Sequence, residues 1–206
     1  MNFKEWEPYY QDIIDYFAFD REMDEKAADI LASLITRDDL PLLRDLCLGK
    51  EVTVCGNAPC LPCDIPRVKR PVFAADAASL VLLEADIRPD VVFSDLDGAT
   101  DEYIEMNNAG TIMVIHAHGD NIPLLKYWIP RFPGPIVATT QSRPLAHVHN
   151  FGGFTDGDRA VFAAHSLGAL EVTILGFDLH DPDVDYMKRG KLYWAEKLLG
   201  ILGYEC

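Results

Sequence analysis

The chain has 206 residues, a length that suits one compact domain of ordinary size with at most a small helical appendage. Hydrophobic residues make up 49% and charged residues 25%, which excludes wholesale disorder. Asp and Glu number 33 against 18 Lys and Arg, so the net charge is −15. Such a surface repels phosphate backbones and anionic lipid, so we expect neither a nucleic acid nor a membrane as partner. A small phosphorylated ligand stays compatible, because metal ions bridge carboxylates to phosphates.

Targeting and redox features favour a cytoplasmic location. No apolar run approaches the length of about 18–20 residues that spans a bilayer, and the acidic, aromatic residues 1–10 do not resemble a secretory signal. The odd number of cysteines predicts reduced thiols. These cysteines are Cys47, Cys55, Cys60, Cys63 and Cys206. The CxxC spacing at residues 60–63 has no second pair beside it, so we interpret it as incidental.

The first fifty residues have a helical pattern. Apolar residues recur there at three-to-four spacing, as in a helical stripe that faces a core. They are Ile13, Ile14, Phe17, Ala27, Ile30, Leu31 and Leu34. Asp20 or Asp24 is a candidate N-cap of the second helix. Gly49 stands where a glycine would end a third helix around residues 40–48.

After Gly49 the pattern changes to short apolar runs, which predict strands at 52–55, 72–75, 91–94, 111–115, 136–139 and 172–175. Predicted helices include 77–85, 122–129, 158–170 and, after the last strand, 187–202. Nearly continuous apolar strands that alternate with helices indicate a parallel sheet covered on both faces. We therefore predict a Rossmann-like α/β fold, with a mostly parallel sheet, helices on both faces and an N-terminal helical region. Residues 1–49 form that region and pack on an α/β catalytic domain of residues 50–206.

Polar residues follow five of these strands, at the ends where ligands bind in such sheets. The segments are 56–59, Asp76, 94–98, 116–121 and 139–141. Asp95 and Asp97 carry the sharpest signal, because two carboxylates in a turn after a strand can reach one hard cation such as Mg²⁺. Asp76 and Asp120 could complete an acidic cluster. The alternative is that these aspartates cap the helices that follow.

Two motifs resemble those of hydrolases. Residues 91–100 resemble the strand and DxDGT turn of haloacid-dehalogenase-type phosphatases, although an alanine precedes the threonine. Residues 116–121 resemble the HxHxDH zinc motif of metallo-β-lactamase-type hydrolases, with Asn121 in place of the last histidine. A zinc site would use such histidines; otherwise His116 is a packed strand-end residue and only His118 faces solvent. A metal-dependent phosphoester hydrolase is therefore an alternative function.

The segment 150–159 is unusual, with three glycines among polar residues before a predicted helix. This composition suits close approach of the backbone to a ligand at a helix N-terminus, and Phe154 could stack on a flat ring. A surface loop with buried phenylalanines is the equally supported alternative.

Taken together, these segments resemble the archaeal 6-hydroxymethyl-7,8-dihydropterin pyrophosphokinase family and, more distantly, the catalytic domain of thiamine pyrophosphokinases. The resemblance rests on Gly56 and Pro59, Asp76, the turn 94–98, the motif 116–121, Thr140-Gln141 and the segment 150–159, in order along residues 52–178. Relatives usually carry a serine after the proline of the first loop, whereas Cys60 follows here. Only backbone contacts to phosphate are then expected from that loop.

The resemblance implies transfer of pyrophosphate from ATP to the hydroxymethyl group of a reduced pterin, with release of AMP, in folate or methanopterin biosynthesis. Mg²⁺ and ATP are the implied cofactor and co-substrate. The resemblance implies catalysis by Asp95, Asp97, Asp120 and His118, with Asp120 or His118 as the proton acceptor, and Mg²⁺ binding by Asp95, Asp97 and Asp120. The implied ATP-binding residues are Gly56, Asn57, Pro59, Asp76, Gln141 and Arg159. The implied pterin-binding residues are Asn150, Gly153, Phe154 and Asp156. Asp178, which ends the last strand, is a further candidate.

Three other functions stay open at this point. One is the same transfer to another alcohol such as thiamine, another is the hydrolase above, and the third is a module that binds Mg-ATP without turnover. Oligomeric state is also open, and a homodimer is one outcome. Aromatic residues near the N-terminus could pack either on the sheet domain or on a second subunit; they are Tyr9, Tyr10, Phe17 and Phe19.

Overall fold

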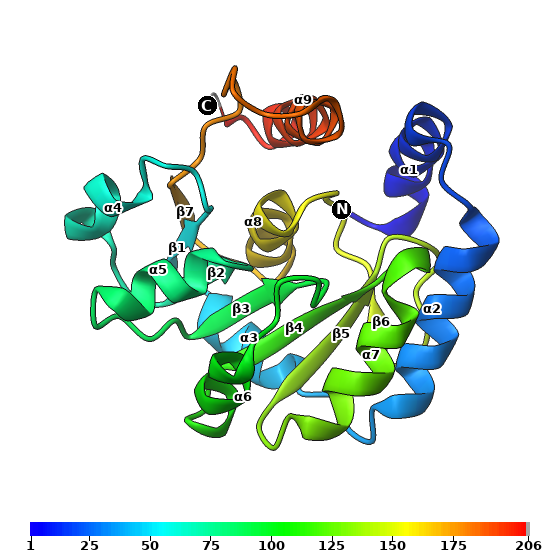
Figure 1. The fold of residues 1–206 in the computed structure, drawn as a ribbon, viewed down its shortest axis with the longest axis horizontal. Coiled ribbons are helices and arrows are strands. Elements are labelled where there is room, and N and C mark those ends of the chain that lie inside the picture. Colours follow the sequence, from blue (N-terminus) through cyan, green and yellow to red (C-terminus); the bar gives the residue numbers. More distant parts are fainter. Residues whose placement is uncertain (205–206) are drawn as a thin grey trace.

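The computed structural model describes residues 1–204, and within them seven parallel strands form one sheet (Figure 1). The strand order is β6-β5-β4-β3-β2-β1-β7. The strands are β1 Glu51–Cys55, β2 Val72–Ala75, β3 Val91–Ser94, β4 Ile112–Ala117, β5 Ile136–Thr140, β6 Val148–His149 and β7 Glu171–Leu175. The predicted α/β class and parallel sheet are confirmed. The two-residue strand β6 is too short to leave a pattern in the sequence, and it was not predicted.

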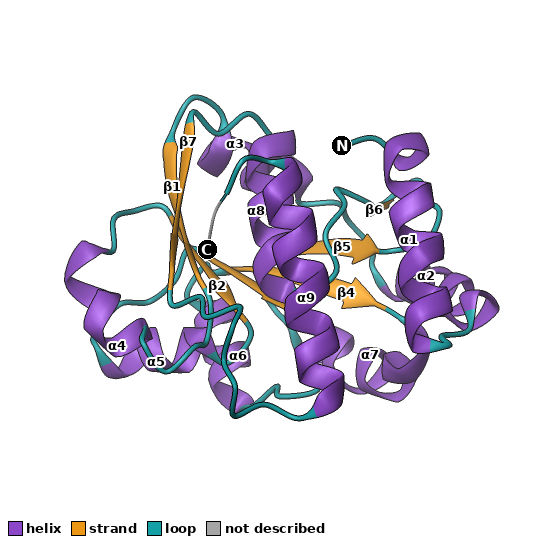
Figure 2. Cartoon of the chain, turned by 90° about the horizontal axis from the view of Figure 1, so that it is seen from above, coloured by secondary structure: helices purple, strands orange, loops and turns teal. Residues whose placement is uncertain are grey.

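The helices cover both faces of the sheet, as predicted. They are α1 Phe3–Phe17, α2 Arg21–Leu34, α3 Leu40–Cys47, α4 Leu61–Asp64, α5 Ala78–Glu84, α6 Asp101–Asn108, α7 Ile122–Trp128, α8 Asp156–Ser166 and α9 Tyr186–Ile201, with short 3₁₀ turns at Ile65–Arg67, Gly119–Asn121 and Ile129–Arg131. One core packs α2, α5, α6 and α7 against residues such as Val92 and Met113. The other packs α3, α8 and α9 against residues such as Phe73 and Val114. Figure 2 shows α8 and α9 together over this second face.

The strand order places the site. From β1 to β6 each new strand is added on the same side, and the chain then returns to place β7 on the other side of β1. The order therefore reverses between β1 and β7, and α8, which makes the return, lies on the opposite face from α5, α6 and α7. In parallel sheets ligands bind at such a reversal, beyond the carboxyl ends of the strands.

The N-terminal helices pack within the chain. In α1, buried residues such as Trp6 and Ile13 share a cluster with Trp194 and Leu198 of α9. Phe17 lies 5.2 Å from Phe154 between ring centroids, so the aromatic residues of this region pack on the rest of the chain. Helix α2 joins the core on the other face. The division into 1–49 and 50–206 stays a prediction.

The predicted helix ends at Asp20 and Gly49 are confirmed, whereas Asp24, the other candidate N-cap, has a different role. Asp20 caps α2 by accepting a hydrogen bond from the Glu22 backbone N–H at 2.9 Å, and Gly49 follows α3 with φ of +68°. Asp24 is not a cap. It is 3% exposed and accepts hydrogen bonds from Tyr10 Oη (2.7 Å), Gln141 Nε2 (2.7 Å) and the Gly119 N–H (2.8 Å). One buried carboxylate thus joins α1 and α2 to the ends of β4 and β5.

No helix among the described residues combines the length and apolar character needed to cross a bilayer.

We expect Asp24→Ala to destabilise the protein by about 3 kcal/mol, because it leaves three donors, two of them buried, without their acceptor. Urea unfolding measures the difference in free energy. The control is Asp29→Ala, which removes an exposed carboxylate from the same helix and should change stability by no more than about 0.5 kcal/mol. Equal effects of the two substitutions would contradict a structural role for Asp24.

Candidate active site

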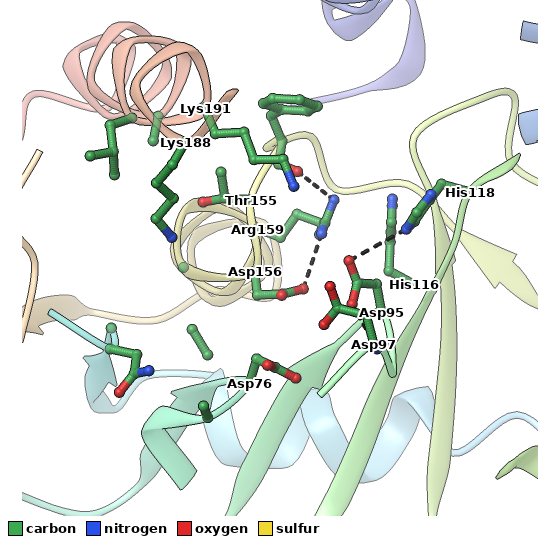
Figure 3. Close-up of a pocket in the computed structure, with 18 of the residues that line it drawn as sticks. Asp76, Asp95, Asp97, His116, His118, Thr155, Asp156, Arg159, Lys188 and Lys191 are labelled. Carbon is green, nitrogen blue, oxygen red and sulfur yellow. Dashed lines mark hydrogen bonds and ion pairs between the residues drawn. The ribbon is translucent and has the colours of Figure 1, made fainter. Parts of the chain in front are cut away.

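A cavity of about 490 Å³ lies beyond the carboxyl ends of the strands, between the sheet, the N-terminus of α8 and helix α9 (Figure 3). Most of the predicted site residues line it. They are Gly56, Asn57, Pro59, Asp76, Asp95, Asp97, His118, Asp120, Gln141, Phe154, Asp156 and Arg159, and Asp178 lines it as well. The topology therefore brings together residues that are more than a hundred positions apart.

The loop after β1 is tied to the end of β7. The Gly56 N–H donates to the Leu175 carbonyl at 2.8 Å, and the Ala58 N–H donates to the Gly176 carbonyl at 2.9 Å. Asn57 and Pro59 are exposed on this loop and line the cavity. This end of the cavity lies where the strand order reverses.

The ends of β2 and β3 are joined through Asp76. Its Oδ1 accepts hydrogen bonds from Ser94 Oγ (2.6 Å) and Tyr103 Oη (3.0 Å). Ser94 Oγ also accepts from the Leu96 N–H at 2.9 Å, in a turn where Leu96 is buried with φ of +73°. A buried non-glycine residue in this conformation is strained, and such strain gathers at functional sites. The turn places Asp95 and Asp97 on the cavity. Neither caps α6, whose N-cap is Thr100, so the capping alternative is wrong for this pair.

The carboxylates of this turn differ in their electrostatics. Burial alone would raise the pKa of Asp95, but His118 Nε2 at 3.4 Å and the charge of Arg159 outweigh it, so the pKa falls well below its usual range. Burial, followed by the charges of Asp95 and Asp76, raises the pKa of Asp97. Asp95 thus holds its negative charge firmly, while Asp97 has no ion-pair partner among residues 1–204. A divalent cation would relieve this crowding.

The donor types suit Mg²⁺, but the predicted three-carboxylate site is not preformed. Among residues 1–204 no three His, Cys, Asp or Glu side chains converge as a metal-binding group. Asp120 lines the same cavity, but it is exposed on the turn after β4. Mg²⁺ commonly binds through one or two carboxylates and completes its shell with phosphate oxygens and water. Asp95 and Asp97 fit that pattern.

In the histidine motif after β4, the side chain of Asn121 joins the loop after β3 to the loop after β4 by hydrogen bonds. The amide of Asn121 donates to the carbonyls of Asp95 and His116, both at 2.7 Å, and its oxygen accepts from the His118 N–H at 3.1 Å. Asn121 therefore replaces a zinc ligand of the hydrolase motif with a structural bridge. His118 is half-buried and lines the cavity.

His116 is packed but also lines the cavity. It is 2% exposed, its Nδ1 lies 3.2 Å from Thr139 Oγ1, and its Nε2 has no hydrogen-bond partner among the described residues. Burial, aided by the charge of Arg159, moves its pKa well below 6.5, so the ring is neutral at physiological pH. A buried, unpartnered nitrogen in a cavity wall is a place for a ligand hydrogen bond.

The segment 150–159 divides into a structural part and a cavity part. Asn150 donates to the carbonyls of Gln141 (3.0 Å) and Ser142 (2.8 Å), and Gly153 has φ of +87° with no room for a Cβ against the Arg159 backbone. Neither lines the cavity, so their predicted contact with substrate has no support in the geometry. Phe154 lines the cavity.

Asp156 and Arg159 form an ion pair on the cavity wall, with Arg159 Nη2 3.0 Å from Asp156 Oδ1. Arg159 Nη1 also donates to the Phe154 carbonyl at 2.6 Å. Burial raises the pKa of Asp156 to about 7, although the charge of Arg159 acts in the opposite direction. This carboxyl is therefore near its midpoint at physiological pH.

Sequence reasoning missed two cations and one carboxylate. Lys188 and Lys191 of α9 line the cavity, as does Asp24. The stretch 188–191 holds three basic residues in a chain with few of them, and that density was the available signal. For Asp24 the signal was a carboxylate in helical register with the apolar stripe of Ala27 and Leu31.

Comparisons with known proteins agree on one family. The family model for 6-hydroxymethylpterin diphosphokinase MptE-like proteins matches residues 27–184. Three relatives are each named 6-hydroxymethyl-7,8-dihydropterin pyrophosphokinase. That from Methanothermobacter thermautotrophicus is 37% identical over 98% of this chain and 95% of its own. The relative from Methanocaldococcus jannaschii is 36% identical over 98% of this chain and 96% of its own. The relative from Pyrococcus furiosus is 38% identical over 86% of this chain and 78% of its own.

Among solved structures, the chain is similar to the MAF glycosyltransferase of Magnetospirillum magneticum, at 20% identity and a TM-score of 0.46, over 68% of this chain and 24% of that one. The family match covers most of the chain, and two of the archaeal relatives match it almost from end to end. The chain belongs to the 6-hydroxymethylpterin diphosphokinase MptE-like family.

Proposed function

We propose that this protein transfers the terminal pyrophosphoryl group of ATP to the hydroxymethyl oxygen of 6-hydroxymethyl-7,8-dihydropterin and releases AMP. The observation that carries the proposal is the near full-length similarity to relatives named for this activity. The cavity supports it, since a single site combines carboxylates for Mg²⁺, cations for phosphate and an unpartnered hydrogen-bonding group for a polar ring. The pathway that uses the product and the cytoplasmic location stay predictions.

The strand order suggests how two substrates share the cavity. Neighbouring strands lie about 4.8 Å apart, so the edge from β1 to β4 measures about 14 Å. The nucleoside would lie at the reversal between β7 and β1, beside Gly56 and Asn57. The phosphates would then lie over the ends of β2 and β3, beside Asp95 and Asp97. The pterin would lie over β4 and β5.

This arrangement of the substrates changes the roles that were expected for Gln141 and Asp156. Gln141 lies at the end of β5, so we assign it to the pterin rather than to ATP. Asp156 pairs with Arg159 through one oxygen and is influenced by Asp95 and Asp76, which places it nearer the phosphates. His116 Nε2 is the group that can accept a hydrogen bond from an N–H of the ring.

The chemistry required of the chain is positioning and charge stabilisation. The hydroxymethyl oxygen attacks the β-phosphorus, the bond from that phosphorus to the α–β bridging oxygen breaks, and the electron pair leaves with AMP. The alcohol proton passes to His118 or Asp120, which lie on the turn after β4. Mg²⁺ held by Asp95 and Asp97 would neutralise charge on the phosphates.

The direct test of the function is a product assay. Incubated with Mg-ATP and 6-hydroxymethyl-7,8-dihydropterin, the protein should form AMP and pterin pyrophosphate in equal amounts, resolved by chromatography. AMP should appear only when the pterin is present. Formation of ADP, release of free phosphate, or AMP formed equally well with thiamine would contradict the proposal.

The carboxylate turn should be essential to turnover. We expect Asp97→Asn to lower kcat/KM by about 10²–10³-fold, since it removes a group that stabilises charge in the transition state. The matched control is Asp45→Asn, an exposed position on α3 away from the cavity, which should leave kcat/KM unchanged. A loss of less than threefold for Asp97→Asn would exclude a catalytic role for this carboxylate.

The raised pKa of Asp156 predicts a pH effect on stability without ligands. The folded protein holds this proton up to about pH 7, whereas the unfolded chain releases it near pH 3.8. Ionisation of Asp156 therefore costs stability between these values, by up to about 1.4 kcal/mol per pH unit. Urea unfolding between pH 4 and 7 should show Asp156→Asn gaining stability relative to wild type as pH rises. A constant difference would contradict the raised pKa.

A further inference from the structure

Helix α9 carries two lysines that face the cavity without a partner among the described residues. Lys188 and Lys191 both line it, and Figure 3 shows them approaching from the side opposite Asp95 and Asp97. Within residues 1–204, neither side chain has an ion pair or hydrogen bond. Arg159, the third cation of the cavity wall, is committed to Asp156 and to the Phe154 carbonyl. The two lysines are therefore the cations that are free to meet a ligand.

The position of these lysines is set by packing on the other side of α9. Trp194 and Leu198 are buried against α1, and Gly190 lies between the two lysines. A Cβ at Gly190 would lie 3.0 Å from the ring of Phe17, so this glycine allows α1 and α9 to approach closely. Asp185 caps the helix by accepting from the Lys188 backbone N–H at 2.7 Å. The lysines thus project from a fixed helix.

The two lysines occupy different parts of the cavity. Figure 3 shows Lys191 next to Arg159, on the side of the cavity that faces Asp95 and Asp97. Lys188, one turn earlier, lies farther from Arg159 and the carboxylate turn in Figure 3. With the substrates ordered as proposed above, Lys191 lies nearer the reacting phosphates and Lys188 nearer the nucleoside.

A triphosphate placed in this cavity meets a cluster of carboxylates, so it needs compensating positive charge on its other side. A lysine ammonium is a compact point charge that binds phosphate oxygens through charge-assisted hydrogen bonds. The spacing of three residues places both ammonium groups on one face of α9. They can therefore bind successive phosphates of one chain.

We propose that Lys191 binds the β- and γ-phosphates that are transferred and that Lys188 binds the α-phosphate that leaves in AMP. This assignment rests on the proposed function and names residues that the family match, at 27–184, does not include. When the bond between the β-phosphorus and the bridging oxygen breaks, the electron pair moves onto AMP, next to Lys188. Lys191 stays with the pyrophosphoryl group as it joins the pterin oxygen.

Binding measurements separate the two roles without turnover. The probes are AMP and α,β-methylene-ATP, which carries carbon in place of the oxygen whose bond is cleaved, each with Mg²⁺ in isothermal titration calorimetry. Lys191→Met should weaken the ATP analogue by about 10–100-fold and leave AMP within twofold. Lys188→Met should weaken both probes by a similar factor. The arginine variants at both positions should restore most of the affinity.

Lys26→Met is the matched control, since it removes one positive charge from an exposed site on α2 outside the cavity. It should bind both probes as wild type does, and circular dichroism should show all variants folded. Unchanged analogue binding in Lys191→Met, or equal loss of AMP binding in both methionine variants, would overturn the assignment. Failure of the wild type to form AMP with the pterin would instead overturn the proposed function, because that result does not depend on the lysines.

Discussion

Carboxylates at the ends of β2 and β3 face cations from α8 and α9 across one cavity, and the rest of the molecule sets the distance between these two walls. Asp95 and Asp97 are held by a turn in which Ser94 and Asp76 are hydrogen-bonded. Arg159 is held by its ion pair with Asp156, while the side chains of Lys188 and Lys191 have no ion-pair or hydrogen-bond partner within residues 1–204. A site with excess acid on one side and free cations on the other is suited to a metal-bound polyphosphate.

Helices from both ends of the chain add walls to the cavity beyond the sheet edge, since residues of α2 and α9 line it. Helix α1 packs against α9 through Trp6, Trp194 and their neighbours, and Trp6 Nε1 donates to the Gln141 carbonyl at 2.8 Å. Asp24 joins α2 to Gln141 and to Gly119 in the turn that carries Asp120. The N-terminal region therefore holds both the β4–β5 end of the site and the helix that carries the lysines.

Site residues could be predicted from the sequence where they directly follow a strand. Asp95 and Asp97 were predictable because paired carboxylates directly follow an apolar strand, and parallel strands bring such ends to one edge. Lys188 and Lys191 were harder to predict: their basic stretch stands out in an acidic chain, but lysines on a helix have the same pattern whether they face solvent or a cavity. Asn150 and Gly153, which the sequence placed at the pterin, lie outside the cavity for a related reason. Segments rich in Asn and Gly suit backbone turns and ligand contacts equally well, and only the hydrogen bonds of Asn150 distinguish the two.

In the proposed complex both substrates lie in order along one sheet edge, with the reacting phosphates between the two charged walls. A crystal structure with Mg²⁺, α,β-methylene-ATP and 6-hydroxymethyl-7,8-dihydropterin tests it most directly. We expect the nucleoside at Gly56 and Asn57, the phosphates between the carboxylate turn and the α9 lysines, and the pterin beside His116 and Gln141. A nucleoside bound over β4 and β5, with the pterin at the end of β1, would contradict it.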